Sequence, residues 1–277
     1  MAVRLIVDST ADLLPQQKEA VTVVPLTVRF GTEEFIDGVT ITHKEFYEKL
    51  ASAKESPTTS QATPADFDDV FAQVAGSGDS AVVLTLASRL SGTYQSACIA
   101  AEDYENIFVV ESGSVAIGIG LLAQLALDMI HQGLDAKTIA QRLQEEKGNL
   151  RIVAVVDTLE YLKKGGRISA TAAIAGGLLG IRPIISVEKG QIHTLDKARG
   201  AKQAFSVLNR QIQRSGGIDF RRPVLLGYTG TNPEAVEKYR EESCKDWGNP
   251  NPDYTCIGSV IGTHAGPGAV AVAFFTK

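Results

Sequence analysis

Short apolar runs alternate with amphipathic stretches along the first 150 residues. The apolar runs have the length and the β-branched content typical of strands. They cover residues 3–7, 21–30, 81–86 and 107–110. Apolar positions with helical spacing lie between them, over residues 42–50, from 64, from 93, over 115–132 and over 135–146. This alternation predicts crossover connections and a mostly parallel, Rossmann-like sheet, which is an α/β fold.

Two of these helix starts carry capping signals. Thr42 and Glu45 have the spacing of a capping box. Thr63 stands directly before Pro64, and proline is favoured at the first position of a helix. We therefore expect helices to begin at residues 43 and 64.

The pattern changes near residue 150. Strands are expected at residues 152–156, 184–187, 192–195, 224–228, 256–261 and 269–275, and helices at 159–162, 170–179, 200–214 and 233–244. The second and third of these strands flank a four-residue turn, which indicates a hairpin. A hairpin within a mixed pattern predicts an α+β domain with a mixed sheet. We therefore divide the chain into an N-terminal α/β domain, residues 1–150, and a C-terminal α+β domain, residues 151–277.

Residues 254–276 contain no Asp, Glu, Lys or Arg, and this stretch is long enough to span a membrane. The glycine-rich segment 262–268 interrupts it, however. Two buried strands around a loop are therefore the better interpretation. That loop would carry His264.

The composition is that of an ordinary globular protein, with 44% hydrophobic residues and a net charge of −5. This charge gives no general attraction to nucleic acid. Cys98, Cys244 and Cys256 form no Cys-x-x-Cys pair, and the four histidines lack metal-ligand spacing, so no disulfide framework and no metal site are expected. The chain opens on a strand rather than on a basic and apolar leader. These features predict a cytoplasmic protein.

The charge is unevenly distributed along the chain. The segment from Lys163 to Lys202 holds eight Lys or Arg residues against only Glu188 and Asp196, a local charge of +6. A solvated face would account for this excess. A docking surface for an anionic partner is the alternative.

Hydroxyl side chains and glycines follow several of the predicted strands. The segments are Asp8-Ser9-Thr10, Thr58-Thr59-Ser60-Gln61, Ser88-Arg89-Leu90-Ser91-Gly92-Thr93 and Glu111-Ser112-Gly113-Ser114. Open α/β sheets bind their ligands outside the carboxyl ends of the strands. The four segments are therefore expected to converge on a pocket for a small anion.

Nucleotide binding and acyl hydrolysis are the two alternatives to a simple anion pocket. The glycine pairs 118/120 and 176/177 lack the full dinucleotide-binding fingerprint. Ser91 and His264 could serve a serine acyl hydrolase, although no Gly-x-Ser-x-Gly motif surrounds Ser91 and no acid is identified to orient the histidine. Hydrolysis stays an alternative to simple binding. A ligand-contacting role for His264 is favoured over a histidine satisfied by backbone.

Five segments, taken together, resemble the successive signatures of the DegV family. They are Asp8-Ser9-Thr10-Ala11-Asp12-Leu13, Thr59-Ser60-Gln61, Leu90-Ser91-Gly92-Thr93-Tyr94-Gln95-Ser96-Ala97, Leu162-Lys163-Lys164-Gly165-Gly166-Arg167-Ile168 and Ile261-Gly262-Thr263-His264-Ala265-Gly266-Pro267-Gly268-Ala269. The resemblance implies a two-domain α/β protein that binds one long-chain, palmitate-like fatty acid. It also implies a non-catalytic subunit without a cofactor, which presents the acyl carboxylate to the ATP-using subunit of a fatty acid kinase. A lipid carrier without a kinase partner is the remaining alternative, and contact with a membrane surface would be transient at most.

The resemblance also implies roles for particular residues. Thr59, Ser91 and His264 would hold the carboxylate, and Ser60, Gly92 and Thr93 would line its surroundings. Arg167 and Arg199 would contact the kinase subunit. The chain departs from the family pattern at Ala265, where Thr is frequent, and at Ala62, where Pro is common after the glutamine. The head-group site would then be one hydroxyl poorer.

Overall fold

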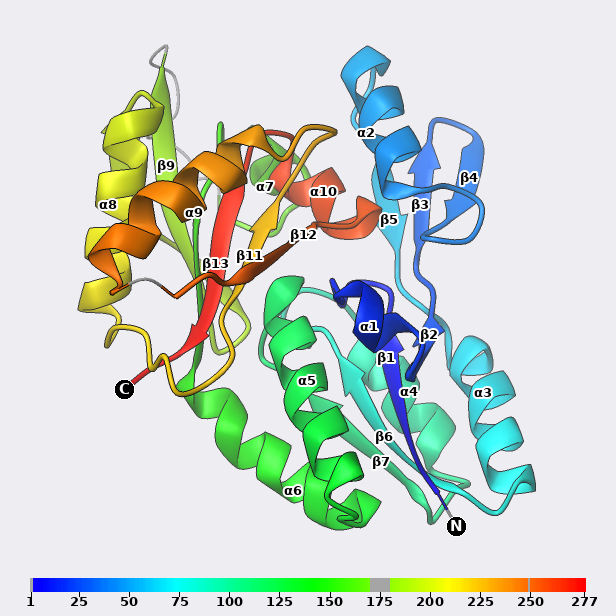
Figure 1. Ribbon diagram of the computed structural model, residues 1–277. Coiled ribbons are helices and arrows are strands. Elements are labelled where there is room, and N and C mark those ends of the chain that lie inside the picture. The colour runs from blue at the N-terminus through cyan, green and yellow to red at the C-terminus, as the bar shows by residue number, and fades with distance from the viewer. Residues whose placement is uncertain (1, 170–179, 249) are drawn as a thin grey trace.

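The computed structural model describes residues 2–169, 180–248 and 250–277. Its N-terminal half is built on a four-stranded sheet (Figure 1). The strands lie in the order β2 (Val21–Val24), β1 (Val3–Asp8), β6 (Ser80–Thr85) and β7 (Ile107–Glu111). Every neighbouring pair is parallel. The predicted parallel sheet is therefore confirmed.

Helices cover both faces of this sheet. Because side chains alternate along a strand, Ile6 and Val83 pack in one apolar cluster, whereas Leu5 and Leu84 pack in another. The first cluster includes residues of α3 and α4, and the second includes residues of α5 and α6. These helices are α3 (Pro64–Gly76), α4 (Thr93–Ala101), α5 (Ile117–His131) and α6 (Ala136–Glu146).

The C-terminal half contains a six-stranded mixed sheet, as predicted. Among its described strands, β11 and β12 pair in parallel and the other neighbours are antiparallel. β9 and β10 form the expected hairpin. The order is β10 (Gln191–Arg199), β9 (Ile181–Glu188), β8 (Leu150–Val155), β13 (Val270–Phe275), β11 (Leu225–Tyr228) and β12 (Asp253–Cys256). The predicted helix 170–179 lies outside the described residues.

Helix α5 lies between the two large sheets (Figure 1). It contacts β1 and β6 of the parallel sheet, and β8, β11 and β13 of the mixed sheet. Its sequence, IGIGLLAQLALDMIH, is apolar on nearly every side. A helix of this kind is stable only when it is buried all round. On the opposite face of the mixed sheet lie α8 (Ala201–Arg214) and α9 (Glu234–Asp246).

The predicted strand 21–30 is wrong in one respect, because the chain forms two strands there. β2 ends at Val24, Pro25 follows, and the chain then enters β3 (Thr27–Phe30) in a separate sheet. Proline has no N–H for a strand ladder, which accounts for the break. β3 pairs with β4 (Glu33–Ile36) and β5 (Thr58–Ser60). Neither strand was predicted, since both are short and mostly polar.

The predicted strand 256–261 is also wrong. β12 ends at Cys256, and residues 259–265 form helix α10 (Ser259–Ala265). His264 therefore lies on a helix rather than in a loop between strands. Seven residues are too few to show a helical period, and the glycines at 258, 262 and 266 resemble a loop. Gly266 ends the helix with a φ of 70°.

The predicted capping signals are confirmed. Thr42 Oγ1 accepts a hydrogen bond from the Glu45 N–H, and Thr63 Oγ1 accepts one from the Asp66 N–H. The remaining described helices are α1 (Pro15–Lys18), α2 (His43–Ser52), the 3-10 turn η1 (Lys147–Asn149) and α7 (Glu160–Lys164). No helix in the described part of the chain combines the length and apolar character needed to cross a membrane. The domain division near residue 150 stays a prediction.

The position of α10 depends on contacts with the N-terminal half. α10 packs on α2, α7, β3 and β5. The buried Tyr47 hydroxyl donates a 2.8 Å hydrogen bond to the Ile257 carbonyl, and Asp12 Oδ1 accepts one of 2.8 Å from the Gly258 N–H. Both bonds fix the chain directly before α10.

We expect Tyr47→Phe to lower the free energy of unfolding by about 1 to 3 kcal/mol, because the Ile257 carbonyl would lose its buried donor. Tyr104→Phe is the matched control, since its hydroxyl contacts Asp68 at an exposed position. The control should change stability by less than about 0.5 kcal/mol. Denaturant unfolding measures both variants, and equal effects would contradict this view of the Tyr47 contact.

Candidate functional site

An apolar cavity of about 400 Å³ lies between the mixed sheet and the start of α5. Ile152 and Ala154 of β8, Val187 of β9, Ala271 of β13 and Ile117 of α5 belong to its wall. The wall is continuous with the core cluster that joins α5 to both sheets. An apolar ligand enclosed here would be removed from water along most of its length.

Polar side chains gather at one end of this cavity. β5 supplies Thr59 and Ser60, the loop after β6 supplies Ser91 and Gly92, and α10 supplies His264. In Figure 1, α10 lies beside β5, although the two elements are some 200 positions apart in the chain. The structure thus brings five of the six predicted ligand-site residues to the cavity wall. Their binding roles stay predictions.

Thr59 and His264 form the central contact of this polar end. Thr59 Oγ1 and His264 Nε2 lie 2.9 Å apart. The other ring nitrogen, Nδ1, is buried and has no hydrogen-bond partner within the described chain. Burial, with a smaller contribution from the charge of Arg167, lowers the pKa of His264 to about 4. The imidazole is therefore neutral at pH 7.

Gly165 permits the position of the His264 ring. A Cβ at position 165 would lie 2.1 Å from His264 Nδ1, which is closer than any side chain allows. The first glycine of the Lys-Lys-Gly-Gly-Arg segment is thus required because any side chain there would collide with the His264 ring. In this segment, a role was predicted only for the arginine.

Ser91 is held by its neighbour Thr93. Their hydroxyl oxygens lie 3.0 Å apart, and Ser91 Oγ also accepts a 3.3 Å hydrogen bond from the Thr93 N–H. Thr93 is fully buried and does not line the cavity. Thr93 therefore orients Ser91 from behind the cavity wall, and its predicted place in the ligand's surroundings stays a prediction.

Gln61 lines the cavity and was not predicted as a site residue. Its Nε2 donates a 3.0 Å hydrogen bond to Ser96 Oγ, so the amide extends across the turn at Gly92. A Cβ at position 92 would lie 2.2 Å from Gln61 Oε1. Gly92 thus leaves room for the Gln61 side chain. The signal was present in the Thr-Ser-Gln segment, whose glutamine follows the two hydroxyls.

The two predicted docking arginines lie in different surroundings. Arg167 lines the cavity, and it donates hydrogen bonds to the carbonyls of Leu90 (3.1 Å) and Gly165 (2.6 Å). Arg167 thus joins the segment after α7 to the loop that carries Ser91. Arg199 ends β10, is exposed, and does not line the cavity. Docking to a partner stays a prediction for both.

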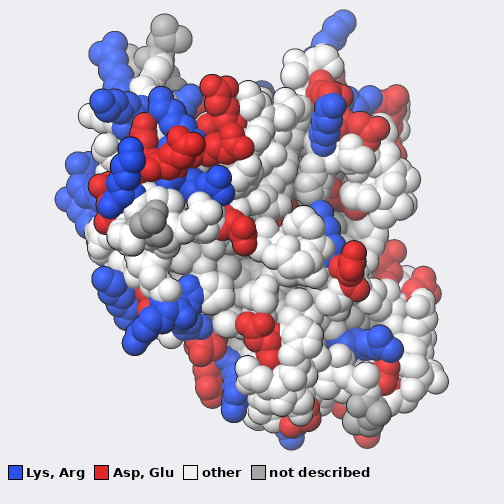
Figure 2. Space-filling view, viewed as in Figure 1, with Lys and Arg blue, Asp and Glu red and all other residues white. Residues whose placement is uncertain are grey.

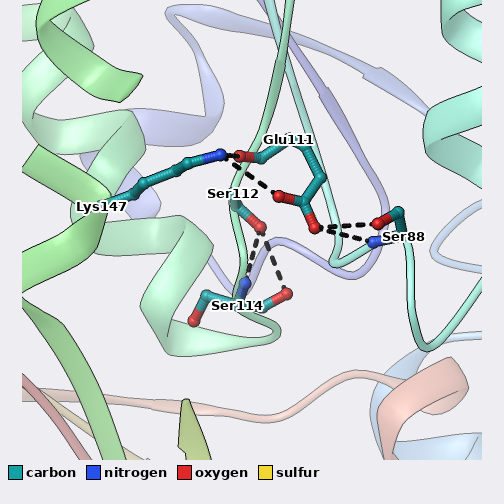
Figure 3. Close-up of polar contacts among 5 residues, drawn as sticks. All are labelled: Ser88, Glu111, Ser112, Ser114 and Lys147. Carbon is teal, nitrogen blue, oxygen red and sulfur yellow. Dashed lines mark hydrogen bonds and ion pairs between the residues drawn. The ribbon is translucent and has the colours of Figure 1, made fainter. Parts of the chain in front are cut away.

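The expectation of four converging hydroxyl segments is wrong for two of them. Figure 3 shows that Ser112 Oγ bonds to the backbone N–H and carbonyl of Ser114. Beside this turn, Glu111 accepts hydrogen bonds from Ser88 and from Lys147 (Figure 3). In the first segment, Thr10 bonds to the buried Asp8 carboxylate. These groups satisfy one another and do not line the cavity.

The basic segment 163–202 does not form an isolated positive surface. Asp196 in this segment pairs with Arg210 of α8, and Arg182 pairs with Asp157. Figure 2 shows acidic and basic side chains interspersed on the side of the molecule that carries α8 and α9. Lys163, Lys164 and Arg167 lie close together in sequence at the end of α7 and just after it, with no acidic residue between them.

Comparison with known proteins agrees with this fold and these motifs. The family model described as "Uncharacterised protein, DegV family COG1307" matches residues 2–277. The DegV domain-containing protein TTE1491 of Caldanaerobacter subterraneus subsp. tengcongensis is 35% identical over 280 residues, covering 99% of each chain. This chain belongs to the DegV family.

Solved DegV structures agree in fold over the whole chain. A DegV family protein from Thermus thermophilus, reported for its fatty acid binding, has a TM-score of 0.89 and 29% identity, with 100% of both chains covered. The Streptococcus pneumoniae fatty acid kinase B3 protein, loaded with linoleic acid, has a TM-score of 0.87 and 22% identity over the full length of both chains. The latter likeness shows the shared fold.

The lowered pKa of His264 predicts a specific pH dependence of stability in this DegV protein. With a folded pKa near 4 and an unfolded value near 6.5, the unfolded state binds more protons between these pH values. His264 therefore costs stability as the pH falls from 6.5 toward 4. We expect the stability of the wild type relative to His264→Gln to fall by on the order of 1 to 3 kcal/mol over this range.

Denaturant unfolding from pH 7.5 to 4.5 measures this difference. Comparing the two proteins at each pH cancels other titrations, such as that of Asp8, whose burial raises its pKa to about 6 and acts in the opposite direction. His131→Gln, at the exposed end of α5, controls for loss of an imidazole. If the difference in unfolding free energy between the wild type and His264→Gln stays constant with pH, the lowered pKa of His264 is contradicted.

Proposed function

We propose that this protein binds one long-chain fatty acid, holds its carboxylate at Thr59, Ser91 and His264, and presents it to a fatty acid kinase. The observation that carries the proposal is the pairing of an apolar cavity of about 400 Å³ with one hydroxyl-lined end. An amphiphile with a single polar head matches this arrangement. The fatty acid bound by the Thermus thermophilus relative supports the same ligand class.

The head-group chemistry suits a carboxylate that must react. The Thr59 and Ser91 hydroxyls can each donate one hydrogen bond. With Nε2–H directed at Thr59 Oγ1, a neutral His264 frees the Thr59 proton for the ligand. Arg167 adds a positive charge from the cavity wall. Such a set holds the carboxylate less tightly than a bidentate arginine would, so one oxygen stays available as a nucleophile.

The tail supplies most of the affinity. Each buried methylene contributes about 0.8 kcal/mol, so a sixteen-carbon chain gains on the order of 10 kcal/mol. Among the described residues, the part of the wall around Ile152, Val187 and Ala271 has no charged group. The tail therefore sets affinity, whereas the polar end sets orientation.

The reaction itself would take place with the partner. A carboxylate oxygen attacks the γ-phosphorus of ATP, a new O–P bond forms, and the bond to the bridging oxygen breaks. ADP leaves with that electron pair, and an acyl phosphate remains in the cavity. We place the protein in the cytoplasm, where ATP is supplied and where the free Cys98, Cys244 and Cys256 would stay reduced.

The hydrogen bonds favour binding over acyl hydrolysis. His264 Nε2 is paired with Thr59, and Ser91 Oγ is paired with Thr93. A serine hydrolase needs the histidine to take the proton of its serine. Here the histidine contacts Thr59 instead of Ser91, and Ser91 contacts Thr93 instead of the histidine.

We expect Ser91→Ala to weaken palmitate binding by about 1 to 3 kcal/mol, because the charged head group would lose one hydrogen bond. Ser88→Ala, in the same loop, is the matched control, since Ser88 contacts Glu111 and does not line the cavity. Displacement of a fluorescent fatty acid measures both. Unchanged affinity for Ser91→Ala and for Thr59→Ala would refute the assigned head-group site.

Arg199→Ala tests the docking role separately from the cavity. We expect acyl phosphate formation with a bacterial fatty acid kinase subunit and ATP to fall by roughly tenfold at low salt, where charge steering is least screened. Palmitate affinity should not change, because Arg199 does not line the cavity. Lys245→Ala, an exposed change at the end of α9, is the control.

Unchanged acyl phosphate formation by Arg199→Ala, or a loss explained by weaker palmitate binding, would require the docking role of Arg199 to be withdrawn. Palmitate binding without any kinase-dependent product would favour a stand-alone lipid carrier. Ester cleavage by the isolated chain, abolished in Ser91→Ala, would favour the hydrolase.

A further inference from the structure

A second hollow, of about 480 Å³, lies on the other side of the Thr59–His264 pair. It shares Thr59, Arg167 and His264 with the apolar cavity. The remaining wall differs in chemistry, because it includes Ser56, Thr58 and Lys164. The polar end of the fatty acid cavity is thus a partition between an apolar space and a polar one.

The outer hollow carries positive charge without a local counter-charge. Lys164 and Arg167 line it, and no carboxylate from the part of the chain that the structure describes does. Neither side chain forms an ion pair with any carboxylate in the described ranges of the chain. Lys164 Nζ donates a 3.2 Å hydrogen bond to Ser56 Oγ, and both residues line the hollow. Two cations among hydroxyls suit an anion with several oxygens.

We propose that this outer hollow holds the phosphoryl group of an acyl phosphate, with Lys164 as a binding residue for its oxygens. The inference rests on the proposed function. A carboxylate held at the shared partition has its tail in the apolar cavity and one oxygen facing outward. A phosphoryl group joined to that oxygen would enter the outer hollow. There the added negative charge would meet Lys164 and Arg167.

The identity of the neighbouring residues supports a phosphoryl group rather than a second lipid chain. Of the described residues that line the hollow, only Pro57 and Tyr161 offer large apolar surfaces, so a second tail would gain little there. A lysine ammonium group is a compact charge with three donors on a flexible stem, which suits phosphate oxygens. Lys164 would therefore discriminate the phosphorylated product from the free fatty acid.

The test compares palmitate with the phosphonate analogue of palmitoyl phosphate, in which a methylene group replaces the bridging oxygen. The tail and the head-group site are common to both ligands, so the ratio of their dissociation constants isolates the phosphoryl site. Lys164→Gln should raise the ratio of phosphonate to palmitate dissociation constants by about tenfold or more, the loss of one charge-assisted contact. Lys164→Arg keeps the positive charge, so its ratio of dissociation constants should stay close to that of the wild type.

Lys163→Gln is the matched control, because Lys163 precedes Lys164 on α7, is exposed, and does not line the hollow. Its ratio should equal that of the wild type. If Lys164→Gln weakens both ligands equally, or changes neither, the phosphoryl site is refuted while fatty acid binding stands. If the wild type binds no palmitate at all, the proposed function fails, and the site in the outer hollow fails with it.

Discussion

The hydrogen bond between Thr59 and His264 is the contact on which the proposed site depends. It joins β5 of the small three-stranded sheet to α10, which the chain reaches some 200 residues later. The bond lies in the partition between the apolar cavity and the outer hollow. Since burial keeps His264 neutral, the imidazole can take part in a hydrogen-bond chain to the ligand without forming a fixed ion pair with it. In the proposed complex, this one contact would set both the position and the reactivity of the head group.

This contact requires a precisely placed α10, and several buried groups supply that placement. Tyr47 and Asp12 bond to the backbone at residues 257 and 258. At Gly262, an added Cβ would lie 2.5 Å from the Tyr47 hydroxyl, so the glycine permits α10 to approach α2. Gly165 has the same effect on the side of α7. The seven-residue helix is thus held by tertiary contacts rather than by its own propensity.

The sequence predicts those helices and strands whose apolar and polar positions show a clear period. It does not predict the elements whose conformation depends on tertiary contacts. The parallel sheet, the hairpin and α5 follow from apolar patterns that can be read within each segment itself. α10 does not, because its helical state depends on Tyr47, Asp12 and the neighbouring helices. Thr59, Ser91 and His264 were chosen by family motif, and the structure brings them to one cavity wall. The inward position of Arg167 depends on the Leu90 carbonyl, a contact 77 positions away that no local pattern encodes.

The proposed function depends on the orientation of the bound chain, with the carboxylate at the hydroxyl-lined end and the tail in the apolar cavity. A crystal structure of the palmitate complex would show this orientation. We expect carboxylate oxygens within hydrogen-bond distance of Thr59 Oγ1 and Ser91 Oγ, and the tail between Ile152 and Val187. A carboxylate at the Ile152 end, or palmitate bound outside this cavity, would contradict it.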